Sequence, residues 1–452
     1  MTDSTDDSTS VDSNEVRKAV TAAGLGNALE WFDFSIYAYT ASTIGKVFFA
    51  QDSSDSLLKS LMFFAVAFAV RPLGGLFFGP LGDRLGRSSV LAITIIMMSF
   101  GTVAIGLIPS YDSIGLWAPA LLLAARLVQG FSTGGEYGGA ATFICEYSPD
   151  NSRGFLASFL EFGTLGGYIV GSLLVFVIQF ALGDDAFTSW GWRIPFLCAA
   201  PLGLFGLYLR LKLEDSPAFV QAQEDNEANG TLAEVIGDHT RQLLLCIGLT
   251  LILNIAYYTV LTYLPSYLET VLKISATESA GLLILVQLVM MSIIFMFGGL
   301  SDKVGRKPVL IAACLSFIAF SYPAFVLLST ATVWGLVAGL AMLGLMTVML
   351  AGVMPSTLPA IFPTRVRYGG FAIAYNVSTS LFGGTAPLII QYLIGQTGNN
   401  FIPAFYLMGA AVIALIPIML IPETANRPLP GSKAQHSGTG PGSGQKKPAP
   451  AA

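Results

Sequence analysis

The chain has 452 residues, of which 54% are hydrophobic and only 11% are charged, and its formal net charge at pH 7 is −5. A soluble domain of this length carries charge on roughly a quarter of its residues, so the composition excludes a water-soluble protein. Lipid offers no hydrogen-bond partners to open backbone, and the alternating pattern of transmembrane strands is missing. The sequence therefore predicts an all-α membrane protein.

The beginning of the chain differs in character from the rest. It reads MTDSTDDSTSVDSNE, a polar and acidic stretch that predicts a disordered tail over residues 1–18. The stretch lacks the basic start and apolar core of a signal peptide. Membrane insertion is therefore expected to depend on the first spanning helix.

Twelve apolar runs are each long enough to cross a hydrocarbon core, which takes about 20 helical residues. The runs cover residues 20–44, 57–80, 89–109, 115–145, 154–181, 192–212, 242–264, 277–300, 308–329, 332–360, 368–394 and 402–422. A hydrophilic segment after the sixth run predicts two pseudo-symmetric six-helix halves. The predicted units are a first half over 19–212, a linker over 213–241, a second half over 242–422 and a disordered tail over 423–452.

Lysine and arginine in the short loops predict the orientation of the bundle, because cytoplasmic loops are the basic ones. When the spans are threaded alternately, one side receives Arg17, Lys18, Arg84, Arg87, Arg153, Arg210, Lys212, Arg241, Lys303, Arg306, Lys307, Arg365, Arg367 and Arg427. The opposite side receives only Lys46, Lys59, Arg193 and Lys273. Both termini are therefore expected in the cytoplasm.

A motif after the second span is repeated in the second half. GDRLGRSSVL, at Gly82–Leu91, aligns with SDKVGRKPVL, at Ser301–Leu310. Repeated halves with a site between them are typical of transporters. We expect these motifs, with arginines from a second repeated loop, to latch helices at the cytoplasmic side; a topology anchor with no moving part is the alternative. The predicted gate residues are Gly82, Asp83, Arg84, Gly86, Arg87, Asp302, Gly305, Arg306, Arg153 and Arg367.

Several charges fall inside the predicted spans. In GNALEWFDF, at Gly26–Phe34, two acids are three residues apart, which places both on one face of a helix. A charge at mid-bilayer costs about 2.5–3.5 kcal/mol by insertion scales, so the buried acids and arginines must face a cavity or pair with each other. We interpret them as a proton-coupling device, the alternative being structural pairs that only fix helix packing. The predicted proton-coupling residues are Asp33, Glu30, Arg126, Glu136 and Glu161.

Aromatic and polar side chains inside the spans suggest a substrate site. Aromatic faces with carboxylates bind ammonium groups, and arginine binds the carboxylate of a zwitterion. The predicted substrate-binding residues are Trp31, Tyr37, Arg71, Arg126, Tyr137, Tyr257, Asn254, Tyr375 and Asn376. For any single aromatic residue, plain packing or an interfacial belt is the alternative.

Other chemistry has no support in the sequence. The cysteines at 145, 198, 246 and 314 are scattered singly and indicate neither disulfides nor metal ligands. GFSTGGEYGGA resembles a phosphate loop only superficially, because it lacks the lysine. The sequence predicts no enzyme, no cofactor, no metal and no nucleic-acid partner, and the energy source is expected to be an ion gradient.

The motifs together resemble a known family. RPLGG…GDRLGR, its echo SDKVGRK, and EYSPDNSRG are similar to the major facilitator superfamily. GNALEWFDF, RLVQGFSTGGEYGGA, WGWRIPF and FPTRVRY narrow the resemblance to its metabolite:proton symporter family. Further stretches, among them LTYLPSYL, VMPSTLPAIFPTRVRY and ETANRPL, resemble the bacterial proline/glycine betaine proton symporters, and the likeness covers about residues 15 to 430.

The resemblance implies the major facilitator fold, a bacterial cell-membrane location, a monomeric functional unit and activation by hyperosmotic stress. It also implies that Asp33 and Arg126 hold the places of the proton-switching pair of related sugar–proton symporters. Some osmosensory members end in a coiled coil, whereas this chain ends PGSGQKKPAPAA without heptads, so no coiled-coil contribution to osmosensing is expected.

The sequence thus predicts proton-coupled uptake of small zwitterionic osmolytes, namely proline, glycine betaine and ectoine, by alternating access. One alternative is a proton symporter for an organic anion such as citrate, 2-oxoglutarate or a shikimate-like compound. Another is a membrane osmosensor that transports nothing, and the buried titratable groups argue against it.

Overall fold

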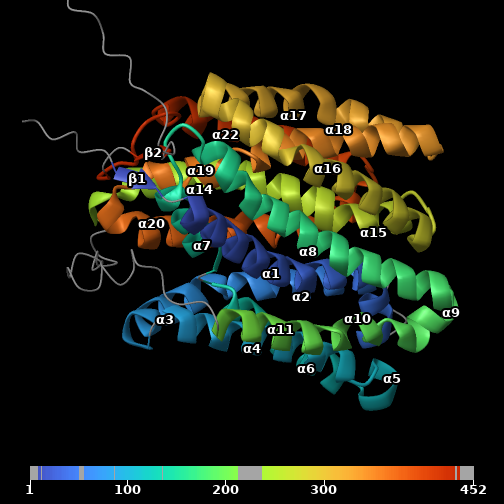
Figure 1. Cartoon of the computed structure of the whole chain (residues 1–452). Helices are drawn as coiled ribbons and strands as arrows, with labels where there is room; N and C mark the ends of the chain where they lie inside the picture. The colour runs from blue at the N-terminus through green and yellow to red at the C-terminus, as the bar shows by residue number, and fades with distance from the viewer. Residues whose placement is uncertain are drawn as a thin grey trace, which may run out of the picture.

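The computed structural model describes residues 9–11, 13–49, 55–85, 87–134, 136–211, 237–432 and 435–437. The predicted linker at 213–241 and the distal parts of both tails fall largely outside these residues. So do Gly86 and the side chains of residues 79–92, among them the first-half gate residues. The described chain is a bundle of nearly parallel and antiparallel helices (Figure 1).

The first half contains one short strand and a series of helices. Their bounds are β1 Thr9–Val11, α1 Ser13–Phe48, α2 Ser56–Ala69, α3 Arg71–Leu85, α4 Arg87–Leu107, α5 Tyr111–Ile114, α6 Trp117–Ser132, α7 Glu136–Tyr147, α8 Arg153–Leu182, α9 Asp184–Ala186, the π-helix η1 Phe187–Gly191, α10 Arg193–Leu197 and α11 Ala199–Leu211.

The second half follows the same plan. Its bounds are α14 Thr240–Tyr257, the π-helix η2 Tyr258–Tyr263, α15 Leu264–Thr270, α16 Ala276–Val304, α17 Arg306–Ser329, α18 Val333–Ala351, α19 Met354–Thr357, the 3-10 helix η3 Pro359–Ile361, α20 Thr364–Ser378, the π-helix η4 Thr379–Gly383, α21 Ala386–Thr397, α22 Ile402–Leu420 and β2 Gln435–Ser437.

Helices from these two series correspond to the twelve predicted spans. In chain order the spans are α1, α2–α3, α4, α6–α7, α8, α10–α11, α14–α15, α16, α17, α18–α19, α20–α21 and α22. Eight helical segments of the described chain are long and apolar enough to cross a membrane by length and composition. The predicted fold class, twelve helices in two six-helix halves, is confirmed.

Small residues allow the helices of the first half to cross closely. A Cβ atom at Gly163 would lie 2.2 Å from the backbone oxygen of Gly24, and one at Gly167 would lie 2.1 Å from that of Ala28. Glycine at these positions lets α8 pack directly on the backbone of α1. The crossing matters for the site because Glu161 on α8 and the acids of α1 lie beside it.

Four spans are interrupted near their middle. The second breaks between α2 and α3, the fourth between α6 and α7, the seventh at η2 and the eleventh at η4. Single π-helical turns are frequent at functional sites, and transporter sites are formed by discontinuous helices at mid-membrane depth. The interruptions therefore indicate where the functional site lies.

The structure differs from the predicted disorder in parts of both tails. α1 begins at Ser13, and β1 pairs in parallel with β2, which joins the two ends of the chain (Figure 1). After α22 the chain stays in contact with the bundle, because the Glu423 carboxylate accepts hydrogen bonds from the backbone N–H groups of Arg306 and Lys307 at 2.9 and 3.1 Å. Residues 421–432 thus form an ordered strap, which composition alone did not reveal.

Candidate functional site

Two acids of α1, Glu30 and Asp33, face the interior of the first half. Glu30 and Arg71 are both about 1% exposed, and a salt bridge of 2.8 Å joins Glu30 Oε1 to an Arg71 Nη atom. The Arg71 guanidinium also lies 5.5 Å from the ring centre of Phe68 and 5.9 Å from that of Phe34. Arg71 was predicted to bind substrate, and the structure places it beside the break between α2 and α3, paired with an α1 acid.

The second acid lies close to a buried arginine without pairing with it. Asp33 interacts electrostatically with Arg126 and with the Thr102 hydroxyl, but among the described residues no ion pair joins Asp33 to Arg126. The Arg126 guanidinium donates to Gln129 at 2.7 Å, and Gln129 donates to Thr102 at 2.6 Å. Sequence reasoning missed Gln129, although its position three residues after Arg126 on the same helix face was a usable signal.

Two nitrogen atoms of Arg126, Nε and Nη2, have no hydrogen-bond partner within the described part of the chain. The guanidinium instead lies over the ring of Tyr37, 4.2 Å from its centre. The Tyr37 hydroxyl donates to the backbone oxygen of Ser60 at 2.9 Å. Tyr37, predicted as a substrate contact, is therefore held between α1 and α2 as the support of Arg126.

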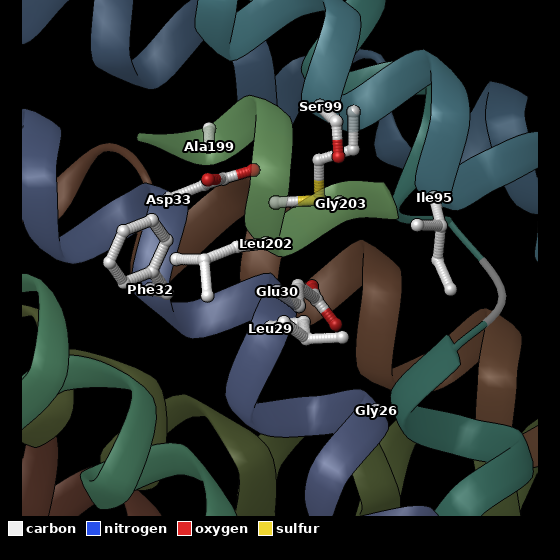
Figure 2. Close-up of a pocket in the computed structure, with 11 residues that line it drawn as sticks. Gly26, Leu29, Glu30, Phe32, Asp33, Ile95, Ser99, Ala199, Leu202 and Gly203 are labelled. Atoms are coloured by element: carbon white, nitrogen blue, oxygen red, sulfur yellow. The ribbon is translucent and has the colours of Figure 1, made fainter. Parts of the chain in front are cut away.

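A small cavity touches both α1 acids. It is lined by Gly26, Leu29, Glu30, Phe32, Asp33, Ile95, Met98, Ser99, Ala199, Leu202 and Gly203, and about 20 Å³ of it is open to a water-sized molecule. Figure 2 shows Glu30 and Asp33 on α1 with residues of α4 and α11 around them. Every lining residue belongs to the first half.

The third predicted acid, Glu161, lies at that interface in a different environment. Its Oε1 atom accepts a short hydrogen bond from the Tyr137 hydroxyl, and its Oε2 atom accepts one from the Tyr257 hydroxyl at 2.7 Å. No cation pairs with Glu161 in the described part of the chain. Because Tyr137 belongs to the first half and Tyr257 to the second, this carboxylate connects the two halves.

Aromatic rings surround Glu161. Tyr375 stacks on Tyr137 with ring centres 4.1 Å apart. The Trp31 ring lies 6.4 Å from that of Tyr257 and 5.8 Å from that of Tyr258. The structure therefore brings four predicted substrate residues, Trp31, Tyr137, Tyr257 and Tyr375, around one predicted proton-coupling acid. We call these four residues, Glu161 and Tyr258 the Glu161 cluster.

The remaining predicted site residues lie at the edge of this cluster. Asn376 donates to the backbone oxygen of Gly134 at 2.5 Å, at the break between α6 and α7. Asn254 accepts a hydrogen bond from Thr379 at 3.2 Å, next to the π-helical turn of the eleventh span. The side chain of Glu136 falls outside the described residues.

Charged groups join the halves at the face where α1 begins and α22 ends, here called the terminal face. The Asp302 carboxylate accepts the backbone N–H groups of Gly154 and Phe155 at 2.8 and 2.9 Å, at the start of α8. It also accepts a hydrogen bond from Arg306 at 2.8 Å. A carboxylate at a helix N-terminus is stabilised by the helix dipole, so Asp302 anchors the second half to α8.

Two further predicted gate arginines act at the same face. Arg367 forms an ion pair of 2.7 Å with Glu146, across the halves. Arg153 pairs with Asp150 and donates to the backbone oxygen of Arg427 in the strap at 3.0 Å. Gly305 takes a φ of +103° between α16 and α17, a conformation that favours glycine.

The opposite face is closed by hydrogen bonds that sequence reasoning missed. Gln287 donates to the Tyr39 hydroxyl at 3.0 Å, and the Tyr168 and Thr262 hydroxyls are 2.5 Å apart. Ser42 donates to Glu269 at 2.8 Å. These contacts join α1 and α8 to the seventh and eighth spans, so the halves touch on both sides of the Glu161 cluster.

Two six-helix halves that close on both sides of a buried polar site have the architecture of a secondary transporter. The family described as "Sugar (and other) transporter" matches residues 18–239 and 223–434, and the chain belongs to this family. The protein is therefore a multi-pass membrane transporter rather than an enzyme, and the superfamily predicted from the motifs is confirmed.

Individual relatives cover nearly the whole chain. The glycine betaine/proline/ectoine/pipecolic acid transporter OusA of Dickeya dadantii (strain 3937) is 45% identical over 94% of this chain and 87% of its own length. The proline/betaine transporter of Escherichia coli (strain K12) is 46% identical over the same shares. A solved structure of the proton:xylose symporter XylE shares the fold, with a TM-score of 0.74 at 22% identity over 92% of this chain and 98% of that one.

Proposed function

We propose that the protein takes up small zwitterionic osmolytes, such as proline, glycine betaine and ectoine, by proton-coupled alternating access. The observation that carries the proposal is Glu161, whose carboxylate accepts hydrogen bonds from two tyrosine hydroxyls of opposite halves. A buried carboxylate ringed by aromatic faces suits a secondary or quaternary ammonium group. The names of relatives 45% and 46% identical to this chain support the same substrate class.

The carboxylate of a zwitterion needs a cation on the other side of the site. Arg71 carries its charge close to Tyr258 and Tyr375, two rings of the Glu161 cluster. Arginine binds carboxylates with paired, charge-assisted hydrogen bonds. Glu161 and Arg71 would therefore hold the two ends of the substrate, with Asn254 and Asn376 at the edge.

Proton coupling is assigned to the acids of α1. Asp33 and Glu30 share the first-half interior with Arg126 and Arg71, and an acid that gains a proton releases the arginine that it had neutralised. Asp33 with Arg126 is the proposed proton switch, and Glu136 is a proposed relay partner. This division leaves Glu161 to the substrate cation.

Alternating access would involve the two halves, residues 19–212 and 242–422, moving against each other around the Glu161 cluster. The proposed gate at the terminal face comprises Asp302, Arg306 and Arg367 of the second half and Arg153 of the first. Asp83, Arg84 and Arg87 are the further first-half residues of the proposed gate. We place the terminal face in the cytoplasm because basic loop residues gather there. A bacterial cell membrane, a monomeric unit and hyperosmotic activation complete the proposal.

One observation favours a second function, the uptake of an organic anion. Arg126 has two buried N–H groups without a partner in the described structure, and such groups attract carboxylates. An organic dianion would engage Arg126 and Arg71 together and would make no use of the aromatic rings around Glu161.

The deciding experiment measures uptake of radiolabelled proline and glycine betaine into proteoliposomes with an inward proton gradient, with and without external sorbitol. Accumulation that a protonophore abolishes supports symport of zwitterions, and a rise with sorbitol supports osmotic control. Uptake of citrate or 2-oxoglutarate without uptake of either zwitterion would overturn the proposal in favour of the organic anion.

A further inference from the structure

The cavity between α1, α4 and α11 is lined by first-half residues, and it touches both acids proposed to carry the proton. We propose that this cavity is a water site that relays a proton between Glu30 and Asp33, within the first half. The inference rests on the proposed function and adds a route for the proton that the substrate never occupies.

Size and polarity both suit a single water. A buried water needs at least about 10–15 Å³ and two to four polar partners, and the cavity offers about 20 Å³. Its polar lining comprises the Glu30 and Asp33 carboxylates and the Ser99 hydroxyl (Figure 2). Both carboxylates can accept hydrogen bonds from one water while Ser99 holds it in place.

Helix geometry separates this water site from the substrate. Glu30 and Asp33 are three residues apart and share a face of α1, whereas Trp31 is turned by about 200° from Asp33 at 100° per residue. Trp31 packs against Tyr257 and Tyr258 of the second half. α1 thus presents its acids to the first half and its indole to the substrate site.

The two acids are attached to different cations. Glu30 bonds to Arg71 at 2.8 Å, and Asp33 interacts electrostatically with Arg126. In the relay, a carboxylic acid on one residue gives its proton to the water while the water gives one of its own to the other carboxylate. One O–H bond breaks for each that forms, and no group leaves the cavity.

The position of the shared proton decides which arginine can serve the substrate. With the proton on Asp33, the Glu30 carboxylate keeps its bond to Arg71. With the proton on Glu30, that bond weakens, and Arg71 can turn to a substrate carboxylate. Because Arg71 also acts on Tyr258 and Tyr375, this exchange would link proton transfer to substrate binding without direct contact between proton and substrate.

The test fills the cavity and compares two fluxes. Ala199→Leu adds three carbons at a buried lining position, and Ala124→Leu adds the same atoms at an exposed position of α6. In proteoliposomes we measure proton-driven uptake of radiolabelled glycine betaine and its exchange at equal pH. We expect Ala199→Leu to lower the ratio of driven uptake to exchange by about tenfold, and Ala124→Leu to leave the ratio unchanged.

A second variant avoids crowding the core. Ser99→Ala removes one polar partner of the water with little change in packing, and we expect the same ratio to fall about threefold. An unchanged ratio in both Ala199→Leu and Ser99→Ala would overturn the relay while leaving the proposed symport intact. A wild-type protein that exchanges glycine betaine but never accumulates it would overturn proton coupling, and with it the relay.

Discussion

The buried carboxylates of Glu30 and Asp33 on α1 and the carboxylate of the Glu161 cluster are stabilised by different partners. On the first-half side of α1, Glu30 is bonded to Arg71 and Asp33 faces Arg126. At the interface, Glu161 is held by the hydroxyls of Tyr137 and Tyr257 and has no cationic partner among the described residues. The Glu30 and Asp33 carboxylates are near cationic side chains of the protein itself. The Glu161 carboxylate is held by neutral hydroxyl groups, so it can still pair with the cationic group of a ligand.

This difference indicates how one helix bundle can bind a proton and an organic cation at separate carboxylates. A proton can alter the balance between acids and arginines without any space for a larger ligand. An ammonium group needs both a carboxylate and aromatic surface, and the Glu161 cluster supplies them together at the interface. The comparison is therefore consistent with the proposal that the proton binds in the first half and the organic cation at the junction of the halves.

The comparison between the α1 acids and Glu161 fails if Glu161 is dispensable for substrate binding. Glu161→Gln keeps the shape and one oxygen acceptor but removes the charge, so we expect substrate affinity and uptake to fall by about 100-fold, since losing one partner of a buried charge pair costs roughly 2–5 kcal/mol. The measurement is equilibrium binding of radiolabelled glycine betaine to the purified protein, with uptake in parallel. Glu278→Gln, at an exposed position of α16, is the control and should bind glycine betaine normally. Near-normal binding by Glu161→Gln would show that the substrate does not bind at the Glu161 cluster.

The complementary change is at Asp33. Asp33→Asn cannot take up a proton, so we expect proton-driven uptake to fall by about 100-fold, at the lower end of the range for the loss of a positioned proton-transfer group, while exchange across equal concentrations continues. Uptake is measured with and without a protonophore. Asp112→Asn, at an exposed position of α5, should behave as the wild type, and uphill accumulation by Asp33→Asn would exclude Asp33 as the coupling acid.

Two adjacent tyrosines sharpen the comparison. The Tyr257 hydroxyl donates to Glu161, whereas the Tyr258 hydroxyl has no hydrogen-bond partner within the described structure. Tyr257→Phe removes a bond to a charged group, worth about 1.5–3 kcal/mol, so we expect affinity for glycine betaine to fall roughly tenfold. Tyr258→Phe removes an oxygen that bonds to nothing described and should change affinity less than twofold. Equal losses in the two variants would mean that ring packing, rather than the bond to Glu161, determines affinity.

Much of the architecture was predictable because it follows from single residues and their periodicity. The apolar runs predicted all twelve spans. Because charged side chains are rare in lipid, Glu161, Arg71 and Arg126 could be identified from the sequence as candidate functional residues. The distinct environments of Glu30 and Glu161 were not predictable. The two acids look alike in sequence, and their partners come from helices 41 and 96 positions away in the chain.

The contacts of the opposite face were missed for a related reason. Ser42, Gln287 and Thr262 are ordinary polar residues in apolar spans, and no spacing rule connects them with Glu269, Tyr39 or Tyr168. Their pairing depends on how the two halves dock, which is a property of the tertiary structure. The proposed gate motifs could be recognised in the sequence because the internal repeat contains the motif twice.

A third carboxylate, Glu423, extends the comparison with the smallest expected effect. It is held by neither arginines nor tyrosines but by the backbone N–H groups of Arg306, Lys307, Thr424 and Ala425. Partial burial alone would raise the pKa of Glu423, but these four N–H groups outweigh it and hold the pKa below its ordinary value. The carboxylate therefore stabilises the fold at pH values above the ordinary glutamate range, and this stabilisation is lost as the pH falls through the lowered pKa.

Glu423→Gln should accordingly reduce Tm by about 1–3 °C at neutral pH, as expected for a weakened helix cap in a large protein. The difference from the wild type should shrink as the pH is lowered below about 4, because the wild-type carboxylate then becomes neutral as well. Thermal unfolding in detergent over a pH series measures both effects, with uptake expected to change less than twofold. A Tm difference that stays constant down to pH 3 would show that the charge of Glu423 contributes nothing to stability.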